Sequence, residues 1–141
     1  MKKVLLQGTF EMINWKHVKA LQLAKQRGDY LIVALNSNKL LKQYKNRLAV
    51  FPWKQKKFIL ESLRFVDKVV MAPEFSCLKL LRKYDIDVYV ITQEWRKYKK
   101  MEFDYMKKKG GKVVVSPKFK GALSTSDIKR ILLKEAQNGN K

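Results

Sequence analysis

The stretch from residue 7 to residue 17, QGTFEMINWKH, combines residue types that could hold a phosphate group. Gly8 and Thr9 close a short apolar run, and a glycine there allows a tight turn that brings the backbone close to an anion. A helix expected to start near Asn14 would direct its unpaired N–H groups and positive dipole end to the same place. His17, the chain's single histidine, would lie one turn into that helix, where a protonated ring could donate to a phosphate oxygen. A partly buried histidine of an ordinary helix is the alternative interpretation of the same residues.

Short apolar runs alternate with amphipathic stretches along the whole chain. The runs are rich in β-branched residues and predict five strands, at residues 2–7, 29–35, 66–72, 87–92 and 112–117. Apolar residues near helical spacing predict helices at residues 14–28, 52–65, 76–84, 94–110 and 124–137. This alternation indicates an α/β fold, a five-stranded parallel sheet with helices on both faces. Ligands of such folds bind beyond the carboxyl ends of the strands, where the strand order reverses, and residues 8–17 would lie at that edge.

The length of the chain, 141 residues, suits one domain spanning residues 1–141. The first residues are basic, but the apolar run after them stops at Gln7, and no later run approaches the length of a transmembrane segment. We therefore expect a soluble cytoplasmic protein. Cys77 is the single cysteine and lies in the apolar setting SCLKLL, so we expect a buried, inert thiol rather than a disulfide or a metal ligand.

The chain is strongly basic, with 32 Lys and Arg residues against 12 Asp and Glu residues and a formal net charge of +20. A field of this sign attracts nucleic acid, anionic membrane surfaces and small phosphorylated substrates, and it does not choose among them. Lysine supplies most of the excess. Compositional drift in an AT-rich genome is therefore an alternative origin of the charge.

Four segments, at residues 2–35, 57–70, 85–95 and 110–129, resemble in order the HxGH nucleotidyltransferase superfamily, and within it the small cytidylyltransferases that act on glycerol 3-phosphate. The resemblance covers nearly the whole chain. It implies a Rossmann-like sheet, a homodimer, and transfer of a CMP group from CTP to a phosphorylated alcohol with the assistance of Mg²⁺. The products would be a CDP-alcohol and pyrophosphate.

The first motif of this family falls on Gly8, Thr9 and Phe10, which match its phosphate-loop segment. Glu11 follows where an aspartate is usual, and the resemblance makes it the candidate metal contact. The HxGH motif itself falls on residues 14–17, NWKH. The resemblance therefore assigns nucleotide phosphates to this loop and to the helix after it.

The NWKH segment keeps one histidine of the motif and loses the other. His17 matches the second histidine, whereas Asn14 replaces the first and Lys16 replaces the glycine that lets the nucleotide approach the helix. Asn14 can donate a hydrogen bond or cap the helix, but it cannot carry a proton or a charge. Removal of one transition-state donor costs about 10²- to 10³-fold in rate, so two changes within four residues could leave little activity.

Basic residues occupy two further positions that the resemblance assigns to phosphates. Lys42 and Lys45, in NKLLKQYKNR, fall where family members place lysines on the CTP triphosphate, and Lys45 is counted among the catalytic residues. A solvated lysine face is the equally open alternative. Arg64, in RFVDKV, matches an arginine-bearing segment and could meet a phosphate as a bidentate fork.

Two later segments resemble the nucleotide-binding parts of the family. TQEW stands where a Gly-Asp-Asp-Trp-like turn is expected, so Trp95 would lie near the base while Thr92 and Gln93 depart from the pattern. LSTSDIK resembles the terminal Ile-Ser-Thr-Thr segment. Ser124 or Thr125 would cap the last helix there and hold a phosphate at its N-terminus.

Two functions from different classes remain open on these observations. One is a working cytidylyltransferase with CTP and a phosphorylated alcohol as substrates. The other is a catalytically degenerate form of the same fold that binds nucleic acid or a larger assembly through its basic surface, with Lys42, Lys45 and Arg47 among the contacts. The altered NWKH segment and the +20 charge favour the second, and the order of matching segments favours the first.

Overall fold

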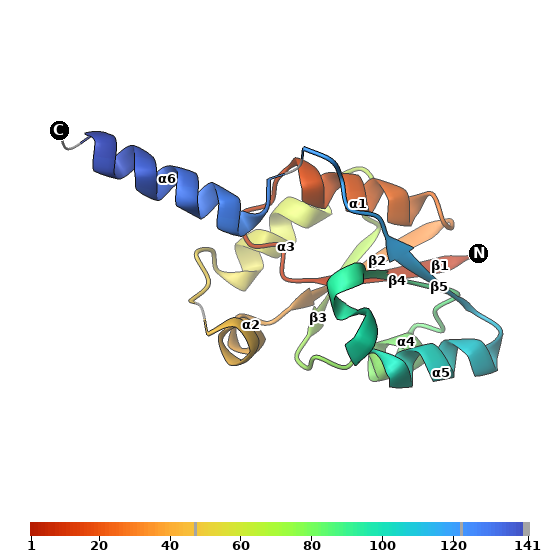
Figure 1. Cartoon of the computed structure of the whole chain (residues 1–141). Helices are drawn as coiled ribbons and strands as arrows, with labels where there is room; N and C mark the ends of the chain where they lie inside the picture. The colour runs from red at the N-terminus through yellow and green to blue at the C-terminus, as the bar shows by residue number, and fades with distance from the viewer. Residues whose placement is uncertain (47, 122, 140–141) are drawn as a thin grey trace.

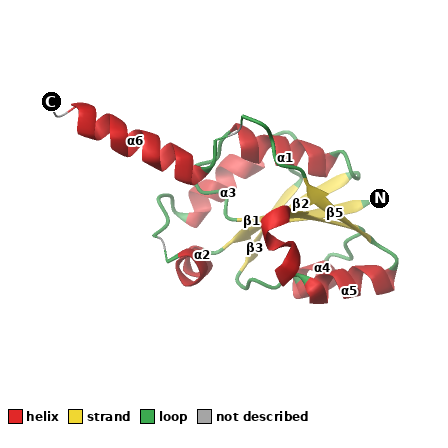
Figure 2. Ribbon diagram, in the orientation of Figure 1, coloured by secondary structure: helices red, strands yellow, loops and turns green. Residues whose placement is uncertain are grey.

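The computed structural model of the chain describes residues 1–46, 48–121 and 123–139. Five parallel strands form one sheet in the order β3-β2-β1-β4-β5, as Figures 1 and 2 show. The strands are β1 (Lys3–Gly8), β2 (Tyr30–Asn36), β3 (Lys68–Ala72), β4 (Val88–Thr92) and β5 (Lys112–Ser116). All five predicted strands are confirmed within two residues. The order reverses between β1 and β4, which places the predicted ligand edge at their carboxyl ends.

The central strands are apolar on both faces because helices cover both faces of the sheet. β1 pairs with β2 through Leu5 opposite Ile32, and with β4 through Leu5 opposite Tyr89. Val4, Leu5 and Leu6 are at most 3% exposed. Strands of a parallel sheet that is covered on both faces are continuous apolar runs. They can therefore be recognised in the sequence although apolar and polar residues do not alternate.

Two helices pack on each face (Figure 1). α1 (Trp15–Lys25) and α3 (Trp53–Glu61) cover one face, with Leu21, Ala24 and Leu60 in its core. α4 (Leu78–Lys83) and α5 (Lys100–Lys109) cover the other face. Cys77, Leu81 and Met106 belong to the core between these helices and the sheet. The two-faced architecture predicted from the sequence is therefore confirmed.

The helices differ from the expectation in two places. α2 (Asn38–Lys45) is capped by the Ser37 hydroxyl. No helix is predicted from the sequence for this segment, where only the basic residues are noted. The long helix expected at residues 94–110 is divided into a 3-10 helix, η1 (Gln93–Tyr98), and α5. Lys99 stands between them with φ −114° and ψ 30°, and its buried side chain is bound inside the protein. The bound Lys99 side chain holds the backbone at the junction of η1 and α5. One continuous helix therefore does not form there.

The last helix, α6 (Thr125–Gly139), leaves the body of the molecule, and Figure 1 shows its far end well away from the sheet. Residues 131–139 are all exposed, including Ile131, Leu132 and Leu133. Trp53, at the start of α3, packs against the core, and its indole N–H donates to Leu35 O at 3.2 Å. In the part of the chain that the structure describes, no helix has both the length and the apolar character needed to cross a membrane.

Candidate active site

A strained turn follows β1 at the edge where the sheet order reverses. Phe10 and Met12 have φ of 53° and 52°, in the left-handed region that bulky residues rarely adopt. The Phe10 ring folds back over Gly8, so that a Cβ at Gly8 would lie 2.7 Å from a ring carbon. Glycine is therefore required at position 8 by close packing. Strain of this kind concentrates where a loop must hold one shape for a ligand.

Three carbonyl groups of this turn accept hydrogen bonds from three different helices. Thr9 O accepts from Lys56 Nζ of α3 at 3.4 Å, and Glu11 O accepts from Thr125 Oγ1 of α6 at 3.0 Å. Met12 O accepts from Asn14 Nδ2, at the start of α1, at 3.0 Å. These donors fix the strained turn against α1, α3 and α6.

The His17 ring lies one turn into α1 and is half-buried beside Phe10, with ring centroids 5.5 Å apart. Its Nδ1 accepts the backbone N–H of Asn14 at 3.2 Å. Burial, and then the positive charge of Lys16, lower the pKa of His17 from 6.5 to about 4. With a pKa of about 4 the ring is neutral near pH 7, and because Nδ1 accepts a hydrogen bond its proton is on Nε2. Nε2–H is then the donor that a phosphate oxygen could use.

Asn14 caps α1, as its residue type allowed. Its Oδ1 accepts from Lys16 N at 3.0 Å while its Nδ2 is bound to Met12 O. Both ends of the amide are thus engaged within the turn. Lys16 itself is exposed, and after burial its positive charge is the second cause that lowers the pKa of His17.

The start of α6 is capped by reciprocal hydrogen bonds. Ser124 Oγ accepts from Asp127 N at 3.1 Å, and Asp127 Oδ2 accepts from Ser124 N at 2.9 Å. The predicted Ser124 cap is therefore confirmed, and these bonds from Ser124 lower the pKa of Asp127. Thr125 has a different role, because its hydroxyl joins α6 to Glu11 O. The helix start and the turn after β1 thus form one connected unit.

Glu11 and Lys56 form a buried acid and base beneath the turn. Glu11 is 6% exposed; its Oε2 accepts from Val50 N at 3.1 Å, and its buried Oε1 has no hydrogen-bond partner among the described residues. Lys56 is 1% exposed, and burial lowers its pKa while the charge of Glu11 opposes that shift. Lys56 is not among the site residues predicted from the sequence. Its spacing with Trp53 and Leu60, on the inward side of α3, is the signal that could have found it.

A cleft of about 390 Å³ opens between the turn, α3 and α6. Of the predicted site residues that the structure describes, Phe10 and Asn14 line this cleft, together with Lys56 and five apolar residues, Met12, Ile13, Phe51, Ile59 and Ile128. The other predicted residues near this turn are Gly8, Thr9, His17 and Ser124. They belong to the connected turn and helix starts, but they are not part of this lining.

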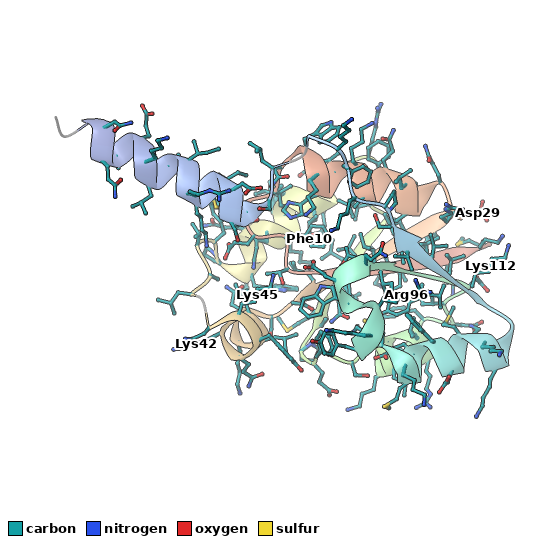
Figure 3. The ribbon with its side chains drawn as sticks, in the orientation of Figure 1. Phe10, Asp29, Lys42, Lys45, Arg96 and Lys112 are labelled. Carbon is teal, nitrogen blue, oxygen red and sulfur yellow. The ribbon has the colours of Figure 1, made fainter. Side chains whose placement is uncertain are left out.

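Lys45, the last residue of α2, approaches the turn after β4. Lys45 Nζ lies 5.9 Å from the centroid of the Trp95 ring, and Trp95 packs edge-on against Phe75 with centroids 5.2 Å apart. In Figure 3, Phe10, Lys42 and Lys45 lie on the α2 side of the molecule, away from Asp29 and Lys112 at the amino edge of the sheet. The structure therefore brings Lys45 and Trp95 together at the ligand edge.

Arg64 is the predicted site residue that the structure places elsewhere. It is exposed in the turn between α3 and β3, with its guanidinium 5.2 Å from the Phe65 ring centroid. This turn enters β3 at the amino edge of the sheet, opposite the carboxyl ends of β1 and β4. Within one chain Arg64 therefore does not join the other site residues. Arg47, named above as a polyanion contact, lies outside the described residues.

Comparison with known proteins assigns the family. The model of the cytidylyltransferase-like family matches residues 5–131. The chain belongs to this cytidylyltransferase-like family. It is 37% identical over 130 residues to a glycerol-3-phosphate cytidylyltransferase of Bacillus subtilis (strain 168), covering 92% of this chain and 95% of the relative. A glycerol-3-phosphate cytidylyltransferase of Staphylococcus aureus (strain NCTC 8325 / PS 47) is 34% identical over 133 residues, covering 94% and 96% of the two chains.

A solved structure shows the same fold at lower identity. The lipopolysaccharide core biosynthesis protein from Thermoplasma volcanium GSS1 superposes with a TM-score of 0.73 and 20% identity, covering 84% of this chain and 98% of that one. The family assignment and the two relatives support a nucleotidyltransferase reaction for this chain. They support the resemblance stated from the sequence.

Proposed function

We propose that this protein transfers a CMP group from CTP to a phosphorylated alcohol of the glycerol 3-phosphate type, releasing pyrophosphate. The relatives that carry this activity in their names cover more than nine-tenths of the chain. The proposal rests on the hydrogen bonding of the His17 ring. Its Nδ1 is occupied by the Asn14 backbone N–H, so its Nε2–H is available one turn into the helix that follows the Gly8–Thr9 turn.

The reaction needs positioning and charge stabilisation rather than a covalent enzyme intermediate. A phosphate oxygen of the alcohol attacks the α-phosphorus of CTP in line, a new P–O bond forms, and the bond to the β-phosphate oxygen breaks to release pyrophosphate. His17 Nε2–H donates to a phosphate oxygen that gains charge in the transition state. Lys45 and Lys42, on α2 at the same edge, neutralise the triphosphate.

Mg²⁺ stays a prediction that follows from the resemblance. Among the described residues there is no group of three or more His, Cys, Asp or Glu side chains that could hold a metal ion. Glu11, the candidate contact, is buried with Val50 N–H on one oxygen and the positive charge of Lys56 nearby. The residues that the structure describes thus supply one candidate carboxylate, Glu11, and no step above is routed through the ion.

A turnover assay tests the proposal directly. Purified protein with CTP, glycerol 3-phosphate and a panel of other phosphorylated alcohols should release pyrophosphate and form a CDP-alcohol. His17→Ala should reduce that release by about 10²- to 10³-fold, whereas Lys19→Ala, on the same helix, should retain it. Absence of turnover with every alcohol, in protein that is folded, would contradict the transferase function.

The engagement of Asn14 supports a second candidate, a degenerate enzyme that binds nucleic acid or another polyanion. Asn14 stands at the first histidine of the motif, and its amide is occupied by Met12 O and Lys16 N. In this case RNA affinity should fall steeply between about 50 and 200 mM salt, because each neutralised phosphate releases counterions. Charge reversal of Lys42 and Lys45 should weaken this binding, and His17→Ala should not.

Restoring the family motif separates the two candidates. If Asn14→His with Lys16→Gly raises turnover from nothing to a measurable rate, the protein is a decayed enzyme. If the unaltered protein already turns over CTP, the second candidate is wrong. A homodimer, implied by the resemblance, stays a prediction that sedimentation equilibrium of the purified protein would test.

A further inference from the structure

A continuous row of side-chain hydrogen bonds runs beneath the ligand edge from α5 to Thr9. Lys99 Nζ donates to Gln7 Oε1 at 2.9 Å, and Gln7 Nε2 donates to Asn36 Oδ1 at 2.8 Å. Asn36 Nδ2 then donates to Thr9 Oγ1 at 3.2 Å. The row crosses the carboxyl ends of β1 and β2, and it ends at a residue of the turn to which we assign the nucleotide phosphates.

The direction of every hydrogen bond in this row is fixed at its buried end. Lys99 is 3% exposed, and an ammonium group has three donors and no acceptor. Gln7 must therefore turn its oxygen to Lys99, where the Cys77 thiol also donates at a distance of 2.8 Å. Its NH₂ group must then face the other way, toward Asn36 Oδ1 and Glu74 O.

The orientation of Gln7 determines the orientation of Asn36 and of Thr9. Because Asn36 accepts from Gln7 through its oxygen, its NH₂ group faces Thr9 Oγ1. The Thr9 hydroxyl oxygen therefore accepts a hydrogen bond, and its own proton cannot point to Asn36. Among the described residues the Thr9 hydroxyl donates to no protein acceptor, so this proton is available to a ligand.

Lys99 is held firmly enough to act as the anchor of the row. Its ammonium also donates to Phe75 O at 2.5 Å and lies 4.1 Å from the Phe75 ring centroid. Nearby, Glu102 is 3% exposed and accepts from the Ser76 hydroxyl and from Cys77 N. Burial lowers the pKa of Lys99, and the negative charge of Glu102 opposes that shift. The thiol of Cys77 provides a second donor that holds Gln7 the same way.

We propose that Lys99, acting through Gln7 and Asn36, is a positioning residue that commits the Thr9 hydroxyl to donate to a phosphate oxygen of the bound nucleotide. This inference rests on the proposed function, because it requires a nucleotide phosphate at the turn after β1. The three residues do not touch the ligand. They fix which way Thr9 presents its proton, before the ligand arrives.

Gln7→Glu tests the direction of the row. A carboxylate at position 7 still accepts from Lys99 and Cys77, but it cannot donate to Asn36. Asn36 must then turn its NH₂ group to Glu and its oxygen to Thr9, and Thr9 donates to Asn36 instead of the nucleotide. We expect the Kd of CTP to rise about tenfold, the equivalent of one hydrogen bond to a charged group, measured by calorimetric titration.

The double-mutant cycle with Thr9→Val separates this effect from simple charge repulsion and from loss of structure. Thr9→Val alone should also weaken CTP binding about tenfold, and Gln7→Glu should add almost nothing in that background. An equal tenfold loss in both backgrounds would mean that the new charge repels CTP, and the proposal would be wrong. Gln7→Leu removes the hydrogen bonds of residue 7 but does not force Asn36 to turn its oxygen to Thr9. It should therefore weaken CTP binding less than Gln7→Glu does.

The proposal and the proposed function fail in different ways. If the unaltered protein does not bind CTP, the proposed function fails first. If it binds CTP and Thr9→Val weakens the binding, but Gln7→Glu binds as tightly as the unaltered protein, the function stands and the directional role of the row is overturned. Thermal unfolding of each variant shows whether the protein titrated is folded.

Discussion

The turn after β1 and the turn after β4 lie side by side at the ligand edge and are built differently. The first is fixed by hydrogen bonds from Lys56, Thr125 and Asn14 to its carbonyl groups. The second, η1, contains no buried residue, and its Trp95 is packed by ring contacts with Phe75 and Tyr98. The phosphate side of the site is thus rigid before a ligand binds, whereas the side assigned to the base relies on aromatic packing at the surface.

The largest expected effect of a single change is at His17, in the rigid half. His17→Ala should reduce CTP turnover by about 10²- to 10³-fold, the cost of one transition-state donor, measured as pyrophosphate release. Circular dichroism should show an unchanged fold. A loss of less than tenfold would mean that the NWKH helix start is not the centre of the reaction.

Lys56→Met should give the largest loss of stability. It removes the donor to Thr9 O and the positive charge that acts on buried Glu11. Loss of a hydrogen-bonding partner of buried polar groups costs about 1–3 kcal/mol in the free energy of unfolding, measured by urea denaturation. Glu11→Gln in the same protein should recover part of the loss. If Lys56→Met alone is neutral, Glu11 is not held by Lys56 and the turn is supported in another way.

The free energy of unfolding should fall as the pH is lowered from 6.5 to 4. The pKa of His17 is about 4 in the folded protein and near 6.5 when unfolded, so between these values the unfolded chain binds a proton that the folded chain does not. The stabilisation is complete above pH 6.5 and is lost toward pH 4, at most about 3 kcal/mol. His17→Gln should flatten this slope. An equal slope in both proteins would assign it to other groups.

Trp95→Leu should cost less, about 1 kcal/mol of stability, because it removes ring contacts that are only half-buried. If the comparison between the two turns is correct, its effect on the Kd of CTP should be smaller than that of Thr9→Val. A larger effect would show that the turn after β4 contributes more to nucleotide binding than the turn after β1.

The smallest effect is expected at the far end of α6. Leu133 is 63% exposed, and Leu133→Ser should change the free energy of unfolding by less than about 0.5 kcal/mol, measured by urea denaturation. A clear loss would show that this part of the helix is covered in solution.

The strands could be predicted because buried parallel strands are local apolar runs, and residues 3–8 and 30–36 are examples. α2 was missed because its basic residues were explained by their position in the family motif. Ser37 before it was available as a cap signal. The turn after β1 and the caps at Asn14 and Ser124 could be located because glycine, asparagine and serine have strong positional preferences.

The supporting side chains of the site could not be predicted in the same way. Lysines are almost always exposed, so their residue type argues against burial of Lys56 and Lys99. Only the helical spacing of Lys56 with Trp53 and Leu60 indicates the opposite. The hydrogen bonds of Gln7 join residues 29 and 92 positions away in the chain. Periodicity describes which way a side chain faces within one element, and such pairings depend on how several elements meet.

Burial of the single thiol gives the protein an internal chemical reporter. Cys77 is 0% exposed, burial raises its pKa to about 11, and its thiol donates to Gln7 Oε1. A thiol reagent at neutral pH would therefore react with the folded protein only when this region opens, because the nucleophile is the thiolate. The rate of labelling would time the opening of the packing beneath the ligand edge without any introduced probe, and a ligand that closes this edge would slow it.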